Sequence, residues 1–191
     1  MKLCFATNNK GKLEEIKALL SGKFDILSLQ EIGCHEELPE TKDTIEGNSL
    51  QKADYVWQNY RVSCFADDTG LEVASLNGEP GVYSAMYAGP DCNAENNMDL
   101  LLKNLHAKTD RKALFRTCIT LLLNGEMHQF EGNVKGEILP TRQGGKGFGY
   151  DPVFKPEGFE KSFAEMTLEE KNKISHRARA VKLLVEYLNK I

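Results

Sequence analysis

The stretch Cys64-Phe-Ala-Asp-Asp-Thr-Gly-Leu-Glu-Val73 runs from apolar residues straight into two adjacent carboxylates and a glycine. Neighbouring acids repel each other and lose hydration on burial, so a hydrophobic core has no use for them. The apolar runs on either side predict two short strands, 62–67 and 71–76. Side chains alternate along a strand, so Asp67 and Asp68 are expected to point to opposite faces. We therefore expect one of them to face a site that requires negative charge.

The remainder of the chain alternates between strand-like and helix-like patterns. Its length of 191 residues fits one domain. Alternating strands and helices with a hairpin signal predict an α/β fold with a mixed central sheet and flanking helices. Strands are expected at 2–7, 24–29 and 113–123, a hairpin turn at 124–126, and helices at 12–20, 45–60, 94–105 and 175–190, with a capping box at 167–170.

Composition narrows the classes of partner. The formal net charge is −4 and no long Lys/Arg run is present, which argues against a nucleic-acid polymer and leaves a small anion open. Five cysteines without a C-x-x-C motif predict buried free thiols in a reducing compartment. Met1 leads directly into a strand and no apolar run has the length of a membrane span. We expect a cytoplasmic protein without a membrane partner.

Residues 6–12, ATNNKGK, form a polar turn between a strand and a helix. Backbone N–H groups at a helix start point outward, and the helix dipole favours an anion there. Thr7 and Asn9 add polar groups, and Lys10 and Lys12 add charge. The turn therefore predicts a phosphate cradle, although it lacks the Walker A spacing. The alternative is an ordinary turn with surface lysines.

Two stretches supply candidate metal ligands. A carboxylate at a strand end, such as Asp68, is a natural Mg²⁺ ligand when phosphates complete the coordination shell. The alternative is an Asx-type turn between two strands. In IEGNSLQKA (45–53), Glu46 is a candidate second carboxylate and Lys52 a candidate phosphate contact. The alternative there is a solvated helix face.

Two later stretches indicate recognition of a base. GGKGFGYDP (144–152) places Phe148 and Tyr150 on a pliant loop, where aromatic rings offer a stacking platform. The alternative is a bulged strand with core aromatics. EEKNKISHRARA (169–180) gathers donors at a helix start, as recognition of a purine with a 6-keto oxygen requires. The alternative there is a structural histidine.

These five stretches, in this order, resemble the inosine triphosphate pyrophosphatase family, also called the Ham1 family. The resemblance rests on ATNNKGK, IEGNSLQKA, FADDTGLEV with GVYSAMYAG after it, GGKGFGYDPVF and EEKNKISHRARA, and it spans residue 4 to about residue 185. Any one motif could arise by chance, whereas all five at these separations are highly specific.

The resemblance implies an activity and a fold. Members hydrolyse ITP, dITP and XTP to the monophosphate and pyrophosphate with Mg²⁺, which clears deaminated purines from the nucleotide pool. The implied structure is a single domain over 1–191, with two lobes around a nucleotide cleft, usually as a homodimer. Asp68 would be the catalytic residue and, with Glu46, a metal ligand. The implied substrate contacts are Thr7, Asn8, Asn9, Lys10, Gly11, Lys12, Lys52, Thr69, Phe148, Gly149, Tyr150, Asp151, Lys171, His176 and Arg177.

Three positions depart from the pattern of the family. Asn8 stands where many relatives have Gly, Thr69 where others have Ser, and Tyr150 where some have Trp. Gly70 is expected to let the chain turn away after the carboxylates.

Rival interpretations of the whole protein are a phosphoribosyltransferase, a Maf-like pyrophosphatase and a non-catalytic purine nucleotide-binding module.

Overall fold

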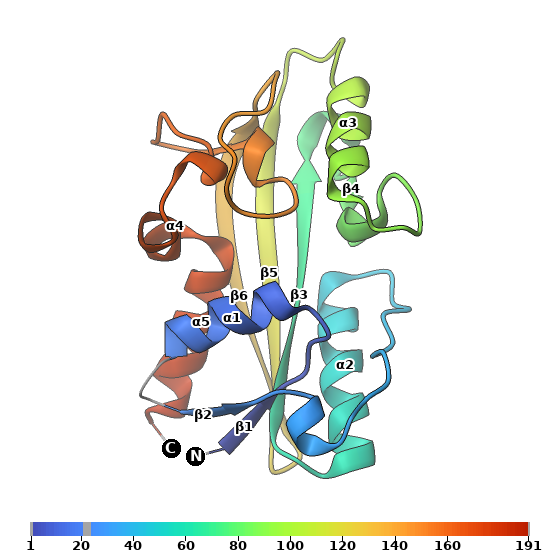
Figure 1. Cartoon of the computed structure of the whole chain (residues 1–191), viewed down its shortest axis with the longest axis vertical. Coiled ribbons are helices and arrows are strands. Elements are labelled where there is room, and N and C mark those ends of the chain that lie inside the picture. Colours follow the sequence, from blue (N-terminus) through green and yellow to red (C-terminus); the bar gives the residue numbers. More distant parts are fainter. Residues whose placement is uncertain (1, 21–23, 191) are drawn as a thin grey trace. The chain divides into compact units, whose positions relative to one another are not determined.

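The computed structural model of the chain describes residues 2–20 and 24–190 (Figure 1). The fold is α/β with a mixed sheet, which confirms the predicted class. The strands are β1 (Lys2–Phe5), β2 (Asp25–Leu27), β3 (Cys64–Val73), β4 (Pro80–Gly81), β5 (Lys112–Leu123), β6 (Glu126–Ile138) and β7 (Phe154–Pro156). The α-helices are α1 (Lys10–Leu20), α2 (Ile45–Tyr60), α3 (Ala94–Asn104), α4 (Leu168–Ile174) and α5 (His176–Leu188), and short 3-10 turns lie at Gln30–Ile32, Ala74–Leu76, Ser84–Met86, Asp151–Val153 and Phe163–Glu165.

The described strands form one sheet in the order β2-β1-β3-β5-β6-β7, with β4 beside β3. Strand β1 pairs in parallel with β2 and β3, whereas β4 is antiparallel to β3 and β7 to β6. The hairpin between β5 and β6 turns at Asn124 and Gly125, with φ values of 52° and 91°. Two residues with positive φ give the turn type whose twist matches its flanking strands.

Strand β3 differs from the sequence expectation. Two short strands with a turn at Gly70 were expected, but β3 is continuous from Cys64 to Val73. Asp67 and Asp68 therefore lie in the middle of a strand and not at its end. The chain leaves the strand only after Val73, where Ala74–Leu76 forms a 3-10 turn.

The chain divides into two compact units, each with its own hydrophobic core. Unit 1 comprises Met1–Asp68, Thr117–Gly132 and Ala178–Ile191, and unit 2 comprises Thr69–Arg116 and Asn133–Arg177. Strands β3, β5 and β6 and helix α5 contribute residues to both units.

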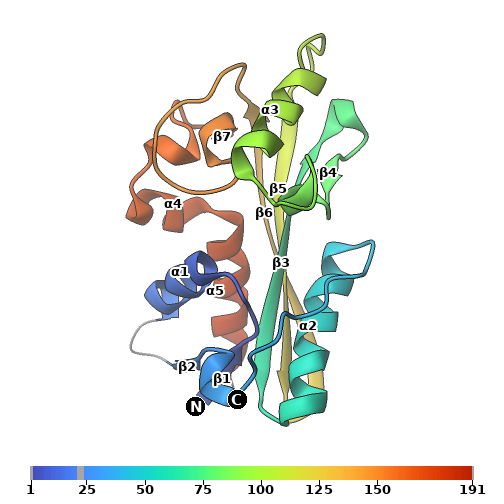
Figure 2. The same ribbon diagram turned by 45° about the vertical axis from the view of Figure 1, so that its right-hand side comes forward.

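In unit 1 the alternation of side chains along the strands sorts the core into two layers. Leu3 and Phe5 of β1 pack with the apolar faces of α1 and α5. Cys4 and Ala6, which point the other way, pack with Ala53 and Val56 of α2. Figure 2 shows α1 and α5 on one side of the strands and α2 on the other. The period of two along β1 thus decides which helix covers which face.

In unit 2 the core joins the end of β3 to α3 and to a group of aromatic rings. Leu71 and Val73 are fully buried in the same cluster as Leu101 of α3. Phe115 and Phe154 meet edge to face, with ring centroids 4.6 Å apart. This cluster supports the glycine-rich loop that follows β6.

Two further expectations concern thiols and membranes. All five cysteines are free thiols, and four of them are buried whereas Cys92 is exposed. No helix in the described ranges is both long and apolar enough to cross a membrane.

Candidate functional site

The turn between β1 and α1 is organised by its own side chains. The Asn9 N–H donates to Thr7 Oγ1 at 3.2 Å, and the Lys12 N–H donates to Asn9 Oδ1 at 3.1 Å. Asn9 therefore occupies the capping position of α1 and satisfies one of the N–H groups that every helix start leaves open. Lys10 and Gly11 form the first turn behind it. The residues of the predicted cradle thus form a turn that their own side chains hold in place.

The positive charges in this turn destabilise the start of the helix. The first turn of α1 contains Lys10 and Lys12 and no acidic residue. The positive end of a helix dipole favours carboxylates there and disfavours cations. Sequences depart from such local rules mainly at functional sites. The two lysines thus support an anion-binding role for the helix start.

The adjacent carboxylates of β3 each meet a different lysine. Lys12 Nζ lies 3.2 Å from Asp67 Oδ1, and Lys52 Nζ lies 3.8 Å from Asp68 Oδ1. Lys52 also forms a close ion pair with Glu40. Asp68 is 8 % exposed and Lys52 is 5 % exposed, so these charges are held largely out of water. The cluster gathers three carboxylates around two ammonium groups.

Burial and neighbouring charges set the protonation of this cluster. Burial raises the pKa of Asp68 above its usual range, while the positive charges of Lys52 and Lys12 oppose that rise. Burial lowers the pKa of Lys52, but the carboxylates of Asp68 and Glu40 outweigh it and raise that pKa overall. Lys52 therefore remains a cation, because the ion pairs compensate for its lost hydration.

Glu40 is a member of this charged cluster that the sequence analysis did not single out. It lies in an acidic stretch without helix or strand periodicity, so nothing in the pattern separated it from its acidic neighbours. The predicted Glu46 lies in the first turn of α2, where its carbonyl accepts from Gln129 Nε2 at 3.4 Å. Within 2–20 and 24–190, no group of three or more His, Cys, Asp and Glu side chains is arranged to hold a metal.

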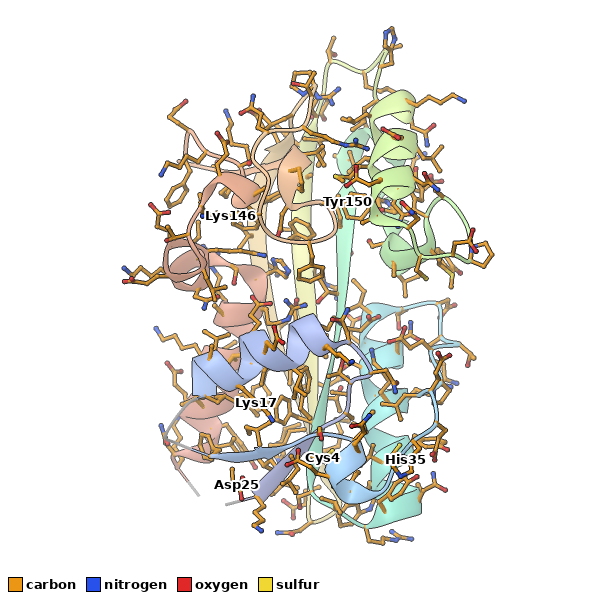
Figure 3. All side chains as sticks on the ribbon, viewed as in Figure 1. Cys4, Lys17, Asp25, His35, Lys146 and Tyr150 are labelled. Atoms are coloured by element: carbon orange, nitrogen blue, oxygen red, sulfur yellow. The ribbon has the colours of Figure 1, made fainter. Side chains whose placement is uncertain are left out.

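Residues 33–44, the acidic segment, lie along α2 and contain neither helix nor strand. The Tyr60 and Tyr55 hydroxyls donate to Glu36 Oε1 at 2.6 and 2.9 Å. These hydrogen bonds, Tyr60 first, hold the pKa of Glu36 down to about 2. Figure 3 labels His35 in this segment.

Asn8 of the turn before α1, which is expected to contact substrate, also contacts this segment. Its side chain donates to the Glu36 carbonyl at 3.2 Å and accepts from the Leu38 N–H at 3.0 Å.

In unit 2 the glycine-rich loop is built around Asp151. Its Oδ2 accepts from the Phe148 N–H at 2.9 Å and from Lys171 Nζ at 2.7 Å. Gly147 has a φ of +82°, and a Cβ there would collide with that same oxygen. Only glycine fits this position, because a side chain would displace the carboxylate. Gly149 also has a positive φ, +63°. Figure 3 labels Lys146 and Tyr150 of the loop.

Phe148 presents its ring to solvent beside two cations. Phe148 is 48 % exposed. Lys171 Nζ lies 5.4 Å and Arg177 Cζ 5.7 Å from its centroid, within the range of cation–π attraction. Lys171 and Arg177 are themselves buried. The two cations therefore hold an exposed aromatic face in place.

Tyr150 and His176 pack against core groups. Tyr150 is buried, its hydroxyl donates to the Ser84 carbonyl at 2.9 Å, and burial raises its pKa. The expectation of two stacking rings is therefore wrong for Tyr150, which is a core aromatic as in the alternative, although it lies in a turn and not in a bulged strand. The His176 ring stacks on Phe115 with centroids 4.6 Å apart. Thr69 is half-buried on β3 and belongs to unit 2.

The structure thus gathers the predicted residues into two groups, one in each unit. Unit 1 holds the turn from Thr7 to Lys12 with Glu46, Lys52 and Asp68, and unit 2 holds Thr69, Phe148, Gly149, Tyr150, Asp151, Lys171, His176 and Arg177. The first group is a helix start with charged neighbours, and the second is an aromatic loop with buried donors.

Comparison with known proteins assigns the chain to a family. The sequence model of the Ham1 family matches residues 3–187. The chain belongs to the Ham1 family, which confirms the resemblance seen in the motifs. The solved structure of the Staphylococcus aureus Ham1 protein is similar at a TM-score of 0.91 and 37 % identity, covering 100 % of this chain and 99 % of that one.

Curated relatives carry a more specific name. A Flavobacterium johnsoniae protein named dITP/XTP pyrophosphatase is 57 % identical over 188 residues, which is 98 % of each chain. One from Thermoanaerobacter pseudethanolicus with the same name is 46 % identical, covering 100 % of this chain and 98 % of its own length.

The buried pair of Asp151 and Lys171 predicts a large loss of stability when only one partner is removed. Lys171→Met leaves the Asp151 carboxylate buried without its cation, which typically costs about 3–5 kcal/mol. Urea denaturation measures the free energy of unfolding. The double variant Asp151→Asn/Lys171→Met is expected to recover most of that loss. Lys173→Met is the control, because Lys173 pairs with Glu169 on the surface, where water screens the pair and its loss is expected to leave the stability nearly unchanged. Equal effects of the two single variants would contradict the role of burial.

The low pKa of Glu36 predicts a pH-dependent contribution to stability. Its pKa in the folded protein, about 2, lies below its ordinary value of 4.5. The hydrogen bonds from the two tyrosines therefore stabilise the fold fully above about pH 4.5 and lose that effect as the pH falls towards 2. Glu36→Gln is expected to lower the urea midpoint at pH 6 and to approach the wild type at pH 3. The exposed neighbour Glu37 supplies the control, Glu37→Gln, and a gap independent of pH would contradict the prediction.

Proposed function

We propose that this protein hydrolyses the non-canonical purine nucleotides ITP, dITP and XTP to their monophosphates and pyrophosphate. The proposal follows the names of its relatives, and the observation that carries it is the unit 1 cluster of Asp68, Lys52 and Lys12 beside the start of α1. A helix start with two lysines suits a polyphosphate. The whole chain is proposed to act as one pyrophosphatase domain, cytoplasmic and homodimeric as the resemblance implies.

The donor chemistry of the cluster fits Mg²⁺. Carboxylate oxygens are the hard ligands that Mg²⁺ prefers, and it commonly takes only one or two of them when substrate phosphates complete its shell. A surplus of carboxylates over lysines favours a divalent cation further. When bound there, Mg²⁺ would withdraw charge from the α-phosphorus and from the leaving pyrophosphate.

We propose Asp68 and Glu40 as the residues that hold the metal. Both approach the same ammonium group, Lys52 Nζ. Glu46, chosen from the sequence, is six positions before Lys52 on α2, so the two side chains leave the helix roughly 120° apart. Residues three or four positions apart share a helix face, and six do not. Glu46 remains the competing assignment.

The residues of unit 1 account for attack at the α-phosphorus. The Asp68 carboxylate orients a water molecule, whose oxygen forms the new bond to phosphorus. The bond from the α-phosphorus to its bridging oxygen breaks, pyrophosphate leaves, and the proton of the water passes to solvent. The N–H groups of the first turn of α1, with Lys12 and Lys52, hold the phosphates.

Selection of the base is proposed for unit 2. Phe148 offers an exposed ring face on which a purine can stack. Lys171, His176 and Arg177 are donors, and a 6-keto purine accepts where adenine presents an amino group. A mismatched donor is left unpaired, which costs about 1–3 kcal/mol.

A product assay tests the proposed reaction. The wild type with Mg²⁺ is expected to convert ITP to IMP and pyrophosphate and XTP to XMP and pyrophosphate, and to leave ATP nearly intact. Asp68→Asn is expected to lower kcat by about 10²–10⁴-fold, because the variant loses the carboxylate that is proposed to orient the attacking water, and loss of a positioned catalytic group commonly has an effect of that size. The control is Asp25→Asn, at an exposed carboxylate of β2.

Two outcomes would contradict the reaction. Formation of IDP and orthophosphate would move the attack to the γ-phosphorus. Binding of ITP without turnover would favour the non-catalytic nucleotide-binding module.

A second assay distinguishes the two glutamates. Glu40→Gln is expected to raise the Mg²⁺ concentration for half-maximal activity by about tenfold, because the number of charged ligands tunes such affinities. Glu37→Gln, at an exposed carboxylate of the same segment, is the control. A larger effect of Glu46→Gln than of Glu40→Gln would assign the second ligand to Glu46.

A further inference from the structure

Asn8 uses both ends of its side-chain amide on the acidic segment. Its Nδ2 donates to the Glu36 carbonyl at 3.2 Å, and its Oδ1 accepts from the Leu38 N–H at 3.0 Å. The amide satisfies both groups in one orientation only, since donor and acceptor occupy opposite ends. Two hydrogen bonds to backbone groups two residues apart fix the direction of the segment as well as its position.

The segment is also fastened to α2 on both sides of Glu40. Before it, Glu36 accepts from Tyr55 and Tyr60. After it, the Thr41 N–H donates to Gln51 Oε1 and the Lys42 N–H to Asn48 Oδ1, both at 2.8 Å. Glu40 thus lies on a short span between fixed points. Its reach to Lys52 depends on where those points hold the backbone.

We propose that Asn8 is a positioning residue that sets the place of Glu40 on Lys52 beside Asp68. The two hydrogen bonds of the Asn8 amide, called the tie below, connect the proposed phosphate-binding turn with the acidic segment. The bond to the Leu38 N–H lies two residues before Glu40. Asn8 acts through this tie and not by contact of its amide with phosphate. For the role of Glu40 the inference rests on the proposed function.

The chemistry of the tie explains why asparagine fits this position. Glycine lacks a side chain, and aspartate offers an acceptor to Leu38 but no donor to the Glu36 carbonyl. Serine is one atom shorter and has a single oxygen for both tasks. An amide on a two-atom stem supplies one donor and one acceptor at a fixed spacing.

The tie itself is tested by hydrogen exchange in the nucleotide-free protein. Asn8→Ala is expected to speed exchange of the Leu38 amide, whereas Glu40→Gln leaves it protected. Asn8→Asp, the conservative variant, keeps the acceptor and is expected to keep that protection. Unchanged exchange at Leu38 in Asn8→Ala would overturn the inference, whatever the protein hydrolyses.

The action on Glu40 is tested by a double-mutant cycle on the Mg²⁺ dependence of ITP hydrolysis. Asn8→Ala is expected to raise the Mg²⁺ concentration for half-maximal activity by about fivefold, an effect common between coupled neighbours. In the Glu40→Gln background the same change is expected to add nothing. An equal factor in both backgrounds would make Asn8 an independent substrate contact and overturn the inference.

The hydrogen-exchange experiment and the double-mutant cycle distinguish a failure of this inference from a failure of the proposed function. A wild type that hydrolyses no nucleoside triphosphate refutes the function, and the exchange of Leu38 still decides whether the tie exists. If Asn8→Ala does not fold, Asn8→Asp replaces it in the double-mutant cycle. The rise in the Mg²⁺ concentration for half-maximal activity is then expected to be smaller, because one of the two hydrogen bonds remains.

Discussion

Two adjacent carboxylates in the middle of β3 are held in the protein by lysines from two helices. Asp67 meets Lys12 at the start of α1, and Asp68 meets Lys52 in the buried face of α2. A buried carboxylate without a cation costs several kcal/mol, so each acid requires its lysine nearby. The rest of unit 1 has to bring both helices to this one point on the strand.

The alternation of the strands meets that requirement. Successive residues of β1 and β3 bury their side chains in two different layers, one with α1 and α5 and one with α2. Consecutive acids on such a strand meet different helices, because their side chains leave on opposite faces. The same period of two that sorts the core therefore also sorts the charges.

Local patterns in the sequence predicted the helices well and the carboxylates of the charged cluster in part. Periodicity placed α2 at its observed bounds, since burial of one helix face leaves a clear signal. The turn expected at Gly70 was wrong because tertiary pairing of β3 with β4 outweighs the turn preference of Thr-Gly. Glu40 was missed because an irregular segment has no period, and its partner lies 12 positions away. Tyr150 was misplaced because spacing does not distinguish an exposed ring from a buried one.

In the first turn of α1, helix stability and the proposed binding of an anion make opposite demands on charge. Lys10 and Lys12 lie at the positive end of the helix dipole, which disfavours them. Three contacts stabilise the turn: the cap by Asn9, the ion pair of Lys12 with Asp67, and the tie from Asn8 to the acidic segment. The Asp67 pair offsets the charge of Lys12, and the cap and the tie add hydrogen bonds that hold the turn. Contacts within the protein thus hold the turn in place, which would spare the proposed binding of an anion the free-energy cost of ordering it.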